Sequence, residues 1–427
     1  MNLNLFGHAD QWLMVDCGIT FNEPLTPDAS HKHDVVCADP SFIEARKHKL
    51  AGIIITHAHE DHIGALPALW QRFKLPVYTT PFTAEILRRK LNKMNKPVPA
   101  TIIEVNTGDC IDIGKFNVTW LMTNHSIPEP HGLVIRTEAG NIFHTADWKI
   151  DKFPMTDKPF QIEQFKALAK ENITAMVCDS TNALLEGHSA SESDCYDGLL
   201  HAVKKAPQKV VVTCFGTNIG RLITLARVAQ KTGRYLALFG YSLKNTVAAA
   251  KRTGHWPEDC LIQDPKYIAY LPPEEIMVVA TGSQGEPYAA MNKLAKQSHS
   301  DLELVAGDTV IFSSIVIPDN KEKVANLVAA FRAQNIHVID NDNSEKVIHA
   351  SGHPNQEELR ALYDWVKPEI AIPVHGEAAH IKANAKTARE TGVRIQLIGE
   401  NGDLYRLAPQ VSLRRKAVAT GRISLDQ

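Results

Sequence analysis

Short apolar runs recur along the chain, and six of them end in an aspartate or a histidine. Runs of this length that are bounded by glycine or polar residues predict β-strands. Side chains at strand ends and in the loops that follow are where α/β proteins build their sites. We therefore expect the six strand ends to share one edge of the fold. The runs are WLMVD ending at Asp16, GIIITH at His57, FNVTWLMTNH at His125, NIFHTAD at Asp147, TAMVCD at Asp179 and EIAIPVH at His375.

The middle of the chain has a different pattern, in which short apolar runs alternate with helical periodicity. Strand-like runs lie at 209–214, 235–239, 276–281, 309–314 and 336–340, and helix-like segments at 218–232, 242–253 and 321–334. Such alternation predicts a parallel α/β domain. Histidine-bearing strand ends resume after it. We therefore expect residues 184–348 to form a domain inserted into another one, which residues 1–183 begin and residues 349–427 complete.

The densest group of metal-seeking side chains is HAHEDH, which begins at His57 directly after a predicted buried strand. In extended backbone His57 and His59 point the same way. An amphipathic helix predicted over residues 61–73 places Asp61 and His62 in its first turn. One loop can thus offer two imidazoles to one ion and an Asp–His pair to a second. These ligands suit zinc, and manganese accepts the same set.

This spacing and the strand ends around it resemble the metallo-β-lactamase superfamily. The resemblance implies an αββα sandwich that binds two divalent ions, which we expect to be zinc, with manganese as the alternative. It implies one ion bound by His57, His59 and His125, a second bound by Asp61, His62 and His375, and Asp147 shared between them. Asp16 matches the aspartate that steadies the histidine loop. Glu60 and His144 match no ligand position, and we expect them to support the site from behind the ligands.

Three later stretches resemble the β-CASP nucleases, a branch of that superfamily with an inserted domain. They are CDSTN with Asp179, HASGHP with His349, Ser351 and His353, and AIPVHGE with His375. TGSQGEP, FSSIVIPDN and PVHGE most resemble bacterial and archaeal ribonuclease J. The implied fold class is α/β, a metallo-β-lactamase sandwich with an inserted parallel β-CASP domain. The implied function is a dinuclear-metal ribonuclease, a 5′→3′ exonuclease that can also have endonuclease activity.

Phosphodiester cleavage needs a nucleophile, charge neutralisation and a proton for the leaving oxygen. By the resemblance the metals and their ligand Asp61 serve the first two needs, and Asp179 with His353 serves the third. We expect His349 and Ser351 to bind a phosphate oxygen. The Gly-flanked turn after the strand at 276–281 offers backbone N–H groups for a terminal phosphate or a neighbouring nucleotide. Its candidate residues are Gly282, Ser283 and Gln284.

Three other functions fit parts of this pattern. A DNA nuclease of the same fold would share every motif, because nothing in them recognises a 2′-hydroxyl. A small-molecule hydrolase would need only the HxHxDH loop, and the inserted domain speaks against it. A non-catalytic RNA-binding module would not need the intact set of metal ligands. Single-stranded RNA with a 5′-monophosphate is therefore the substrate that we expect.

The charge distribution bears on this substrate. The net charge is −2, but the segment 198–257 has no acidic residue and ten lysines and arginines, Arg221 and Arg234 among them. Such a segment is either a set of solvated helix faces or a patch that faces a polyanion.

The sequence also indicates where in the cell the protein is located. No apolar run approaches the ~18–20 residues of a membrane span. No secretory signal is present, and none of the seven cysteines forms a CxxC pair. These features predict a cytoplasmic protein with no membrane partner.

Two features depart from ribonuclease J. Ala146 stands where the family has glycine, and the extra methyl group is either neutral or narrows the pocket. The chain ends at residue 427, where the family continues into an oligomerising domain, so we expect a homodimer rather than a tetramer.

Overall fold

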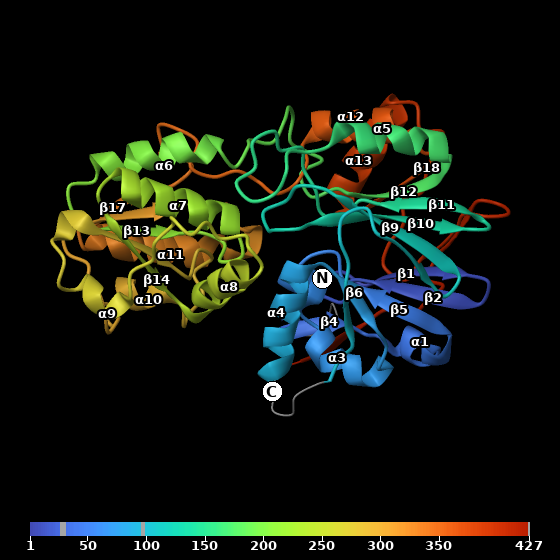
Figure 1. Ribbon diagram of the computed structural model, residues 1–427, viewed down its shortest axis with the longest axis horizontal. Helices are drawn as coiled ribbons and strands as arrows, with labels where there is room; N and C mark the ends of the chain where they lie inside the picture. Colours follow the sequence, from blue (N-terminus) through green and yellow to red (C-terminus); the bar gives the residue numbers. More distant parts are fainter. Residues whose placement is uncertain (26–30, 95–98, 426–427) are drawn as a thin grey trace.

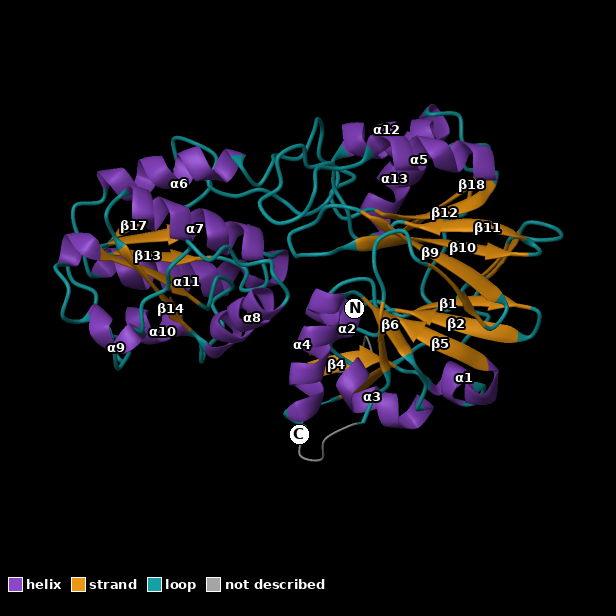
Figure 2. Cartoon of the chain, viewed as in Figure 1, coloured by secondary structure: helices purple, strands orange, loops and turns teal. Residues whose placement is uncertain are grey.

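The computed structural model describes residues 1–25, 31–94 and 99–425, and the chain forms two lobes (Figure 1). The larger lobe contains two sheets packed face to face, with helices on both outer sides (Figure 2). The smaller lobe contains one sheet between helices. Within the described ranges, no helix is both long and apolar enough to cross a lipid bilayer.

The two sheets of the larger lobe enclose an apolar layer. The first sheet has the order β1 (Asn4–His8), β2 (Gln11–Val15), β5 (Leu50–Ile54), β6 (Val77–Thr79) and β7 (Ile102–Glu104). The second has the order β19 (Ile395–Gln396), β18 (Ile370–Val374), β12 (Ile173–Asp179), β11 (Gly140–His144), β10 (His131–Thr137), β9 (Phe116–Met122) and β8 (Cys110–Ile113). Alternate side chains of both sheets fill the space between them, among them Leu13, Ile54, Trp120 and Leu133.

Helices cover the outer face of each sheet. The first is covered by α1 (Ser41–Glu44), α3 (Leu66–Phe73) and α4 (Pro81–Asn92), the second by α5 (Ile162–Ala167), α12 (Gln356–Val366) and α13 (Ala378–Glu390). The predicted αββα sandwich is therefore confirmed. The single helix predicted over residues 61–73 is wrong, because α2 (Glu60–Ile63) ends before α3 begins. Pro67 has no N–H to donate, and its ring excludes a continuous helix through the preceding turn.

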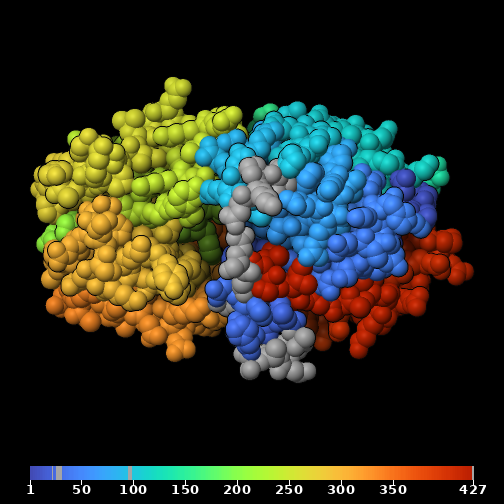
Figure 3. All heavy atoms as spheres, turned by 90° about the horizontal axis from the view of Figure 1, so that it is seen from below, coloured from blue at the N-terminus to red at the C-terminus, as the bar shows by residue number. Residues whose placement is uncertain are grey.

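The last part of the chain returns to the larger lobe. The strand β22 (Arg422–Ser424) pairs with β4 (His33–Ala38), which pairs with β3 (Ile19–Glu23). Figure 3 shows these C-terminal residues in red among the blue N-terminal ones. A separate hairpin joins β20 (Leu404–Arg406) and β21 (Ser412–Arg414). Short 3₁₀ turns lie at Lys47–Lys49, Leu168–Glu171, Pro273–Glu275 and Pro318–Asn320.

The smaller lobe is a parallel α/β domain, as the alternating pattern predicted. All its strand pairs are parallel, in the order β14 (Tyr235–Phe239), β15 (Ile276–Ala280), β13 (Val210–Thr213), β16 (Thr309–Phe312) and β17 (His337–Ile339). One face packs against α6 (Asp194–Lys205), α7 (Ile219–Lys231) and α8 (Tyr241–Arg252), the other against α9 (Pro265–Ile268), α10 (Ala290–Ala295) and α11 (Lys321–Ala333). The boundaries at residues 184 and 348 stay a prediction.

We expected the six ligand-bearing strand ends to lie on one sheet edge, and this expectation is wrong. The strands β2 and β5 belong to the first sheet, whereas β9, β11, β12 and β18 belong to the second. The ends still converge because the sheets pack face to face. The parallel pairs β2–β5, β11–β12 and β12–β18 place carboxyl ends side by side within each sheet.

A buried arginine joins the two segments that cross between the lobes. Arg221 of α7 donates from Nε to Glu192 Oε1 at 2.5 Å and from Nη2 to Oε2 at 3.1 Å. Its Nη1 donates to the carbonyl oxygens of Ser313 and Ile348 at 2.8 and 3.2 Å. Arg221 thereby fixes the outgoing segment at residue 192 and the returning segment at residue 348.

This contact corrects part of the charge hypothesis. The candidate basic patch counted Arg221 and Arg234, but both side chains are buried and bonded inside the protein. Their charges are therefore not available to a polyanion. The other eight basic residues of the segment 198–257 are exposed or half-buried.

We expect Arg221→Met to lower the free energy of unfolding by about 3–5 kcal/mol, because it leaves the Glu192 carboxylate buried without its partner. The double variant Arg221→Met/Glu192→Leu should recover most of this loss, since it removes both charges. Urea unfolding followed by circular dichroism measures both. Lys231→Met, an exposed change on the same helix, is the control and should change little. A double variant no more stable than Arg221→Met would contradict this account.

Candidate metal centre

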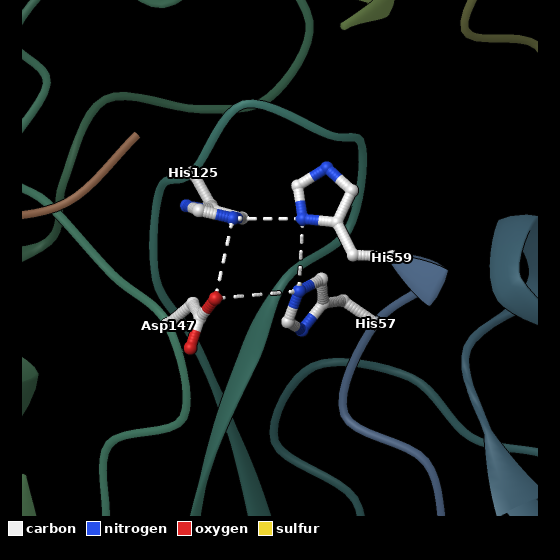
Figure 4. A group of neighbouring side chains, drawn as sticks. All are labelled: His57, His59, His125 and Asp147. Carbon is white, nitrogen blue, oxygen red and sulfur yellow. Dashed lines mark hydrogen bonds and ion pairs between the residues drawn. The ribbon is translucent and has the colours of Figure 1, made fainter. Parts of the chain in front are cut away.

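Three histidines and one aspartate form the first group of ligand atoms (Figure 4). His57 Nε2 lies 3.1 Å from His59 Nδ1, which lies 3.0 Å from His125 Nε2. Asp147 Oδ2 closes the group at 3.8 Å from His57 Nε2 and 3.6 Å from His125 Nε2. The residues come from the ends of β5, β9 and β11, so both sheets contribute to it.

A second group shares Asp147 with the first and adds Asp61, His62 and His375. His62 Nε2 lies 3.3 Å from Asp147 Oδ2 and 3.4 Å from Asp61 Oδ2. His375 Nε2 lies 3.1 Å from Asp61 Oδ2, and its Nδ1 lies 3.4 Å from Asp147 Oδ1. The structure thus brings all seven predicted ligands together, in the two groupings that the resemblance implied.

A third group places the predicted acid–base pair beside these ligands. Asp147, Asp179, His353 and His375 offer donor atoms within 4.8 Å of one another. His353 Nδ1 donates to Asp179 Oδ2 at 2.7 Å. The His353 ring centre lies 4.8 Å from that of His125.

Hydrogen bonds made by the Nδ1 atoms of two histidines fix the orientation of their rings. Asp16, fully buried, accepts from His62 Nδ1 at 2.8 Å and from the backbone N–H of Thr56 at 2.9 Å. His125 Nδ1 donates to the carbonyl of Gly352 at 2.5 Å. In both rings Nδ1 is engaged, so Nε2 is the atom directed at the ligand groups. Such contacts orient rings that bind metals and raise their basicity.

The two residues expected behind the ligands have defined contacts. His144 is buried, and its Nδ1 accepts from the backbone N–H of Ala146 at 2.9 Å. Glu60 begins α2, where a carboxylate is favourable at the helix N-terminus, and it pairs with Lys90. Both support the loops that carry ligands without belonging to a ligand group.

One predicted ligand and two residues beside the ligands have left-handed backbone. Their φ values are +67° at Asp16, +50° at Ala146 and +57° at His375. Such residues persist where the surroundings over-determine them, and they cluster at functional sites. Here the conformation turns each strand end toward the ligands.

We expect Ala146→Gly to raise the free energy of unfolding by about 0.5–1 kcal/mol. Left-handed backbone costs an L-residue roughly 1–2 kcal/mol, and the greater freedom of glycine in the unfolded chain offsets part of that gain. The midpoint of urea unfolding measures it. Ala68→Gly, on the exposed face of α3, is the matched control and should destabilise by a similar amount. Equal destabilisation by both variants would refute the strain at residue 146.

The protonation states suit a cation. Burial lowers the pKa of His57 and of His125 well below the usual value, and lowers that of His59 to about 4, so these rings are neutral, the form that binds metal. In the second group burial opposes charge, but Asp147 raises the pKa of His62 and raises that of His375 to about 10. The crowded, negatively charged carboxylates therefore stabilise positive charge beside them, and the donor set fits divalent ions.

The predicted phosphate-binding residues lie at two separate places. Both ring nitrogens of His349 are buried without a hydrogen-bond partner. Ser351 Oγ accepts from Asn182 Nδ2 at 2.8 Å, next to His353. The turn from Gly282 to Gln284 follows β15 in the inserted domain. Among the described residues, no hydrogen bond or ion pair joins this turn to the ligand groups.

The turn also forms hydrogen bonds within the inserted domain. Gln284 donates from Nε2 to the carbonyl of Ile315 at 2.8 Å and accepts at Oε1 from the N–H of Ile317 at 2.9 Å. Its own backbone N–H donates to Glu286 Oε2 at 3.0 Å. The polar groups of Gln284 are therefore engaged, which leaves Gly282 and Ser283 as the better candidates for an anion.

Sequence reasoning missed several residues that hold the site. Thr181 Oγ1 lies 2.7 Å from Asp179 Oδ1 and 2.9 Å from His375 Nδ1. Asn182 bridges Ser351 and the carbonyl of His353. Both lie in the motif CDSTN, so the signal was present, but only the aspartate was given a role.

Comparison with known proteins places the chain. It is 42% identical to Ribonuclease J of Sinorhizobium meliloti, over all of this chain and 75% of the relative. The chain belongs to the ribonuclease J family. Ribonuclease J of Mycolicibacterium smegmatis and that of Thermus thermophilus are 32% and 31% identical, with the same coverage. The resemblance seen in the sequence is therefore confirmed.

Three family models match successive parts of the ribonuclease J-like chain. The models match a beta-lactamase superfamily domain at 11–176, the ribonuclease J beta-CASP domain at 207–331 and a Zn-dependent metallo-hydrolase RNA specificity domain at 343–398. A crystal structure of an Enterococcus faecalis V583 protein of unknown function has the same fold, with a TM-score of 0.62 and 14% identity over 93% of this chain and 94% of that one.

Proposed function

We propose that the chain is a metal-dependent ribonuclease that degrades single-stranded RNA from the 5′ end, with endonucleolytic cleavage as a second mode. The observation that carries the proposal is the Asp179–His353 pair set against the two groups of ligands that share Asp147. The relatives named Ribonuclease J and the RNA specificity model, which spans both His353 and His375, support RNA as the substrate.

The two ligand groups would hold two divalent ions, zinc or manganese. Such ions, when bound, neutralise charge on the phosphate and provide the nucleophile at neutral pH. Asp147 lies between the groups and contributes a carboxylate to each. Asp16 and Gly352 keep the Nε2 atoms of His62 and His125 directed inward.

His353 is proposed to protonate the leaving oxygen. Its Nδ1 is bound to Asp179, so Nε2 is the atom that delivers a proton. Burial lowers the pKa of His353, but Asp179 outweighs burial and raises it above the usual value. The raised pKa favours the protonated ring, the form that a general acid requires.

His349 and Ser351 are proposed to bind a phosphate oxygen of the substrate. The buried ring nitrogens of His349 make no hydrogen bond of good geometry, although the Ser313 backbone lies near enough to affect the pKa of the ring, and a buried polar group without a full partner is costly. A phosphate would satisfy them. Gly282 and Ser283 are proposed to bind a terminal phosphate or a neighbouring nucleotide through backbone N–H groups.

The test is a time course on one RNA sequence with a 5′-monophosphate, a 5′-triphosphate or a 5′-hydroxyl, with zinc or manganese and a matched DNA strand. We expect mononucleotides only from the monophosphorylated RNA. Mononucleotides from DNA at the same rate would support a DNA nuclease instead. Failure to cleave any RNA, by an enzyme loaded with metal, would overturn the proposal.

Two further expectations accompany this function. Assembly into a homodimer is proposed, and light scattering of the purified chain tests it. A cytoplasmic location is proposed because all seven cysteines are free and six of them are buried, which suits a reducing compartment.

A further inference from the structure

Asn2 reaches the second ligand group from a part of the chain that carries no motif. Its Nδ2 lies 3.0 Å from His62 Nε2, 3.3 Å from Asp61 Oδ2 and 3.2 Å from the carbonyl oxygen of Asp61. The first two are side-chain atoms through which His62 and Asp61 would bind a metal. Asn2 therefore contacts the His62 ring at Nε2, whereas Asp16 contacts the same ring at Nδ1, on its other side.

The backbone fixes Asn2 in this place. Its N–H donates to the Asp61 carbonyl at 2.7 Å, and its carbonyl accepts from the N–H of Gly18 at 2.9 Å. Gly18 lies so close to the same turn that a Cβ there would fall 1.7 Å from the Asp61 carbonyl oxygen. The residues before β1 and after β2 thus form a cradle under Asp61 and His62, and the Asn2 side chain points from it to the ligand atoms.

The chemistry of the amide matches its surroundings. In the neutral ring, the form that binds metal, His62 Nδ1 donates to Asp16 and Nε2 is an acceptor. The Asn2 amide nitrogen therefore faces three acceptors, and its two N–H groups draw the Asp61 carboxylate and the His62 ring edge toward one point. A bound ion would take one lone pair from each ligand. The Asn2 amide would then still donate to the Asp61 carbonyl oxygen and to the remaining lone pair of the Asp61 carboxylate oxygen.

We propose that Asn2 is a positioning residue of the second metal site, which pre-arranges Asp61 and His62 and so raises the affinity of that site for a divalent ion. The inference rests on the metal binding contained in the proposed function, but not on the identity of the substrate. Partners that orient metal ligands change metal affinity by about 10–100-fold when they are removed.

The experiment compares Asn2→Leu with the natural chain. Leucine has nearly the same shape, has no donor, and leaves both backbone hydrogen bonds intact. Competition between the protein and a chromogenic chelator for Zn²⁺ gives the two dissociation constants, and the visible spectrum after Co²⁺ loading reports each ligand sphere. We expect one of the two Zn²⁺ affinities to fall about 10–100-fold and one set of Co²⁺ bands to shift, while the other ion is unaffected.

Two more variants separate positioning from packing. Asn4→Leu is the matched control, because Asn4 lies two residues further along the same edge and its side chain bonds to none of the described residues. It should leave both affinities unchanged. Asn2→Gln retains an amide donor, displaced by one methylene group. Its affinity for Zn²⁺ should therefore fall less than that of Asn2→Leu. Equal losses in Asn2→Leu and Asn2→Gln, or no loss in Asn2→Leu, would overturn the proposal.

These results are independent of the RNA assay. A chain that binds two ions, loses one on Asn2→Leu and cleaves no RNA would support Asn2 and overturn the proposed function. A natural chain that binds fewer than two ions would overturn the inference about Asn2, whatever its activity.

Discussion

Asp147→Asn is expected to reduce kcat/KM on RNA by about 10³-fold or more. Asp147 is the residue common to the three ligand groups, with its carboxylate oxygens 3.3–3.8 Å from His57, His62, His125 and His375. The amide keeps the shape but removes the negative charge that both ions would share. Metal ions stabilise such transition states by several kcal/mol, and each 1.36 kcal/mol corresponds to a factor of ten.

Two measurements make the result interpretable. Metal content by mass spectrometry should fall together with activity, because the substitution acts through the ions. Asp112→Asn, the same change on the exposed strand β8, should alter neither. An Asp147→Asn variant that keeps two ions and natural activity would exclude Asp147 as the shared ligand.

The ligand groups could be predicted because metal chemistry limits the choice of residues. The loop from His57 to His62 carries imidazoles and carboxylates at a spacing that serves few other purposes. The resemblance to the metallo-β-lactamase superfamily added His125 and His375 and divided the ligands between two ions, and the apolar run before each histidine agrees with that assignment. The rule that sites form at strand ends then placed them together, although it did not reveal that two sheets contribute.

The supporting residues could not be predicted, because their roles arise from contacts across long stretches of chain. Asn2 meets Asp61 from 59 positions away, and Asn182 meets Ser351 from 169 positions away. Asparagine and threonine are common in loops, so neither type marks a site. Arg221 was misassigned for the same reason, since its buried partner Glu192 lies on a segment that the sequence does not place beside α7.

Backbone strain was equally invisible. Nothing in the runs WLMVD or EIAIPVH shows that Asp16 and His375 have positive φ. The family resemblance gave the one hint, at Ala146, because glycine in relatives implies a conformation that glycine tolerates best. The break between α2 and α3 was predictable from Pro67, and the helical periodicity across it concealed that signal.

His353→Gln is expected to reduce kcat on RNA by about 10²–10⁴-fold, the usual contribution of a general acid. Glutamine can still donate a hydrogen bond but cannot deliver a proton to the leaving oxygen. Both metal ions should remain bound, since the His353 ring contacts His125 and His375 but belongs to neither of the two groups proposed to hold the ions. KM should change little, because the loss arises in the chemical step.

A substrate with a better leaving group tests this role directly. A 4-nitrophenyl ester of a nucleoside 5′-phosphate releases a phenolate that needs no proton, so the natural chain and His353→Gln should cleave it at similar rates. Asp179→Asn should also spare this ester while it slows RNA cleavage, because Asp179 acts through the His353 ring, 2.7 Å away. If His353→Gln slowed the ester as much as RNA, His353 would serve substrate binding or the metals, and the leaving group would take its proton from elsewhere.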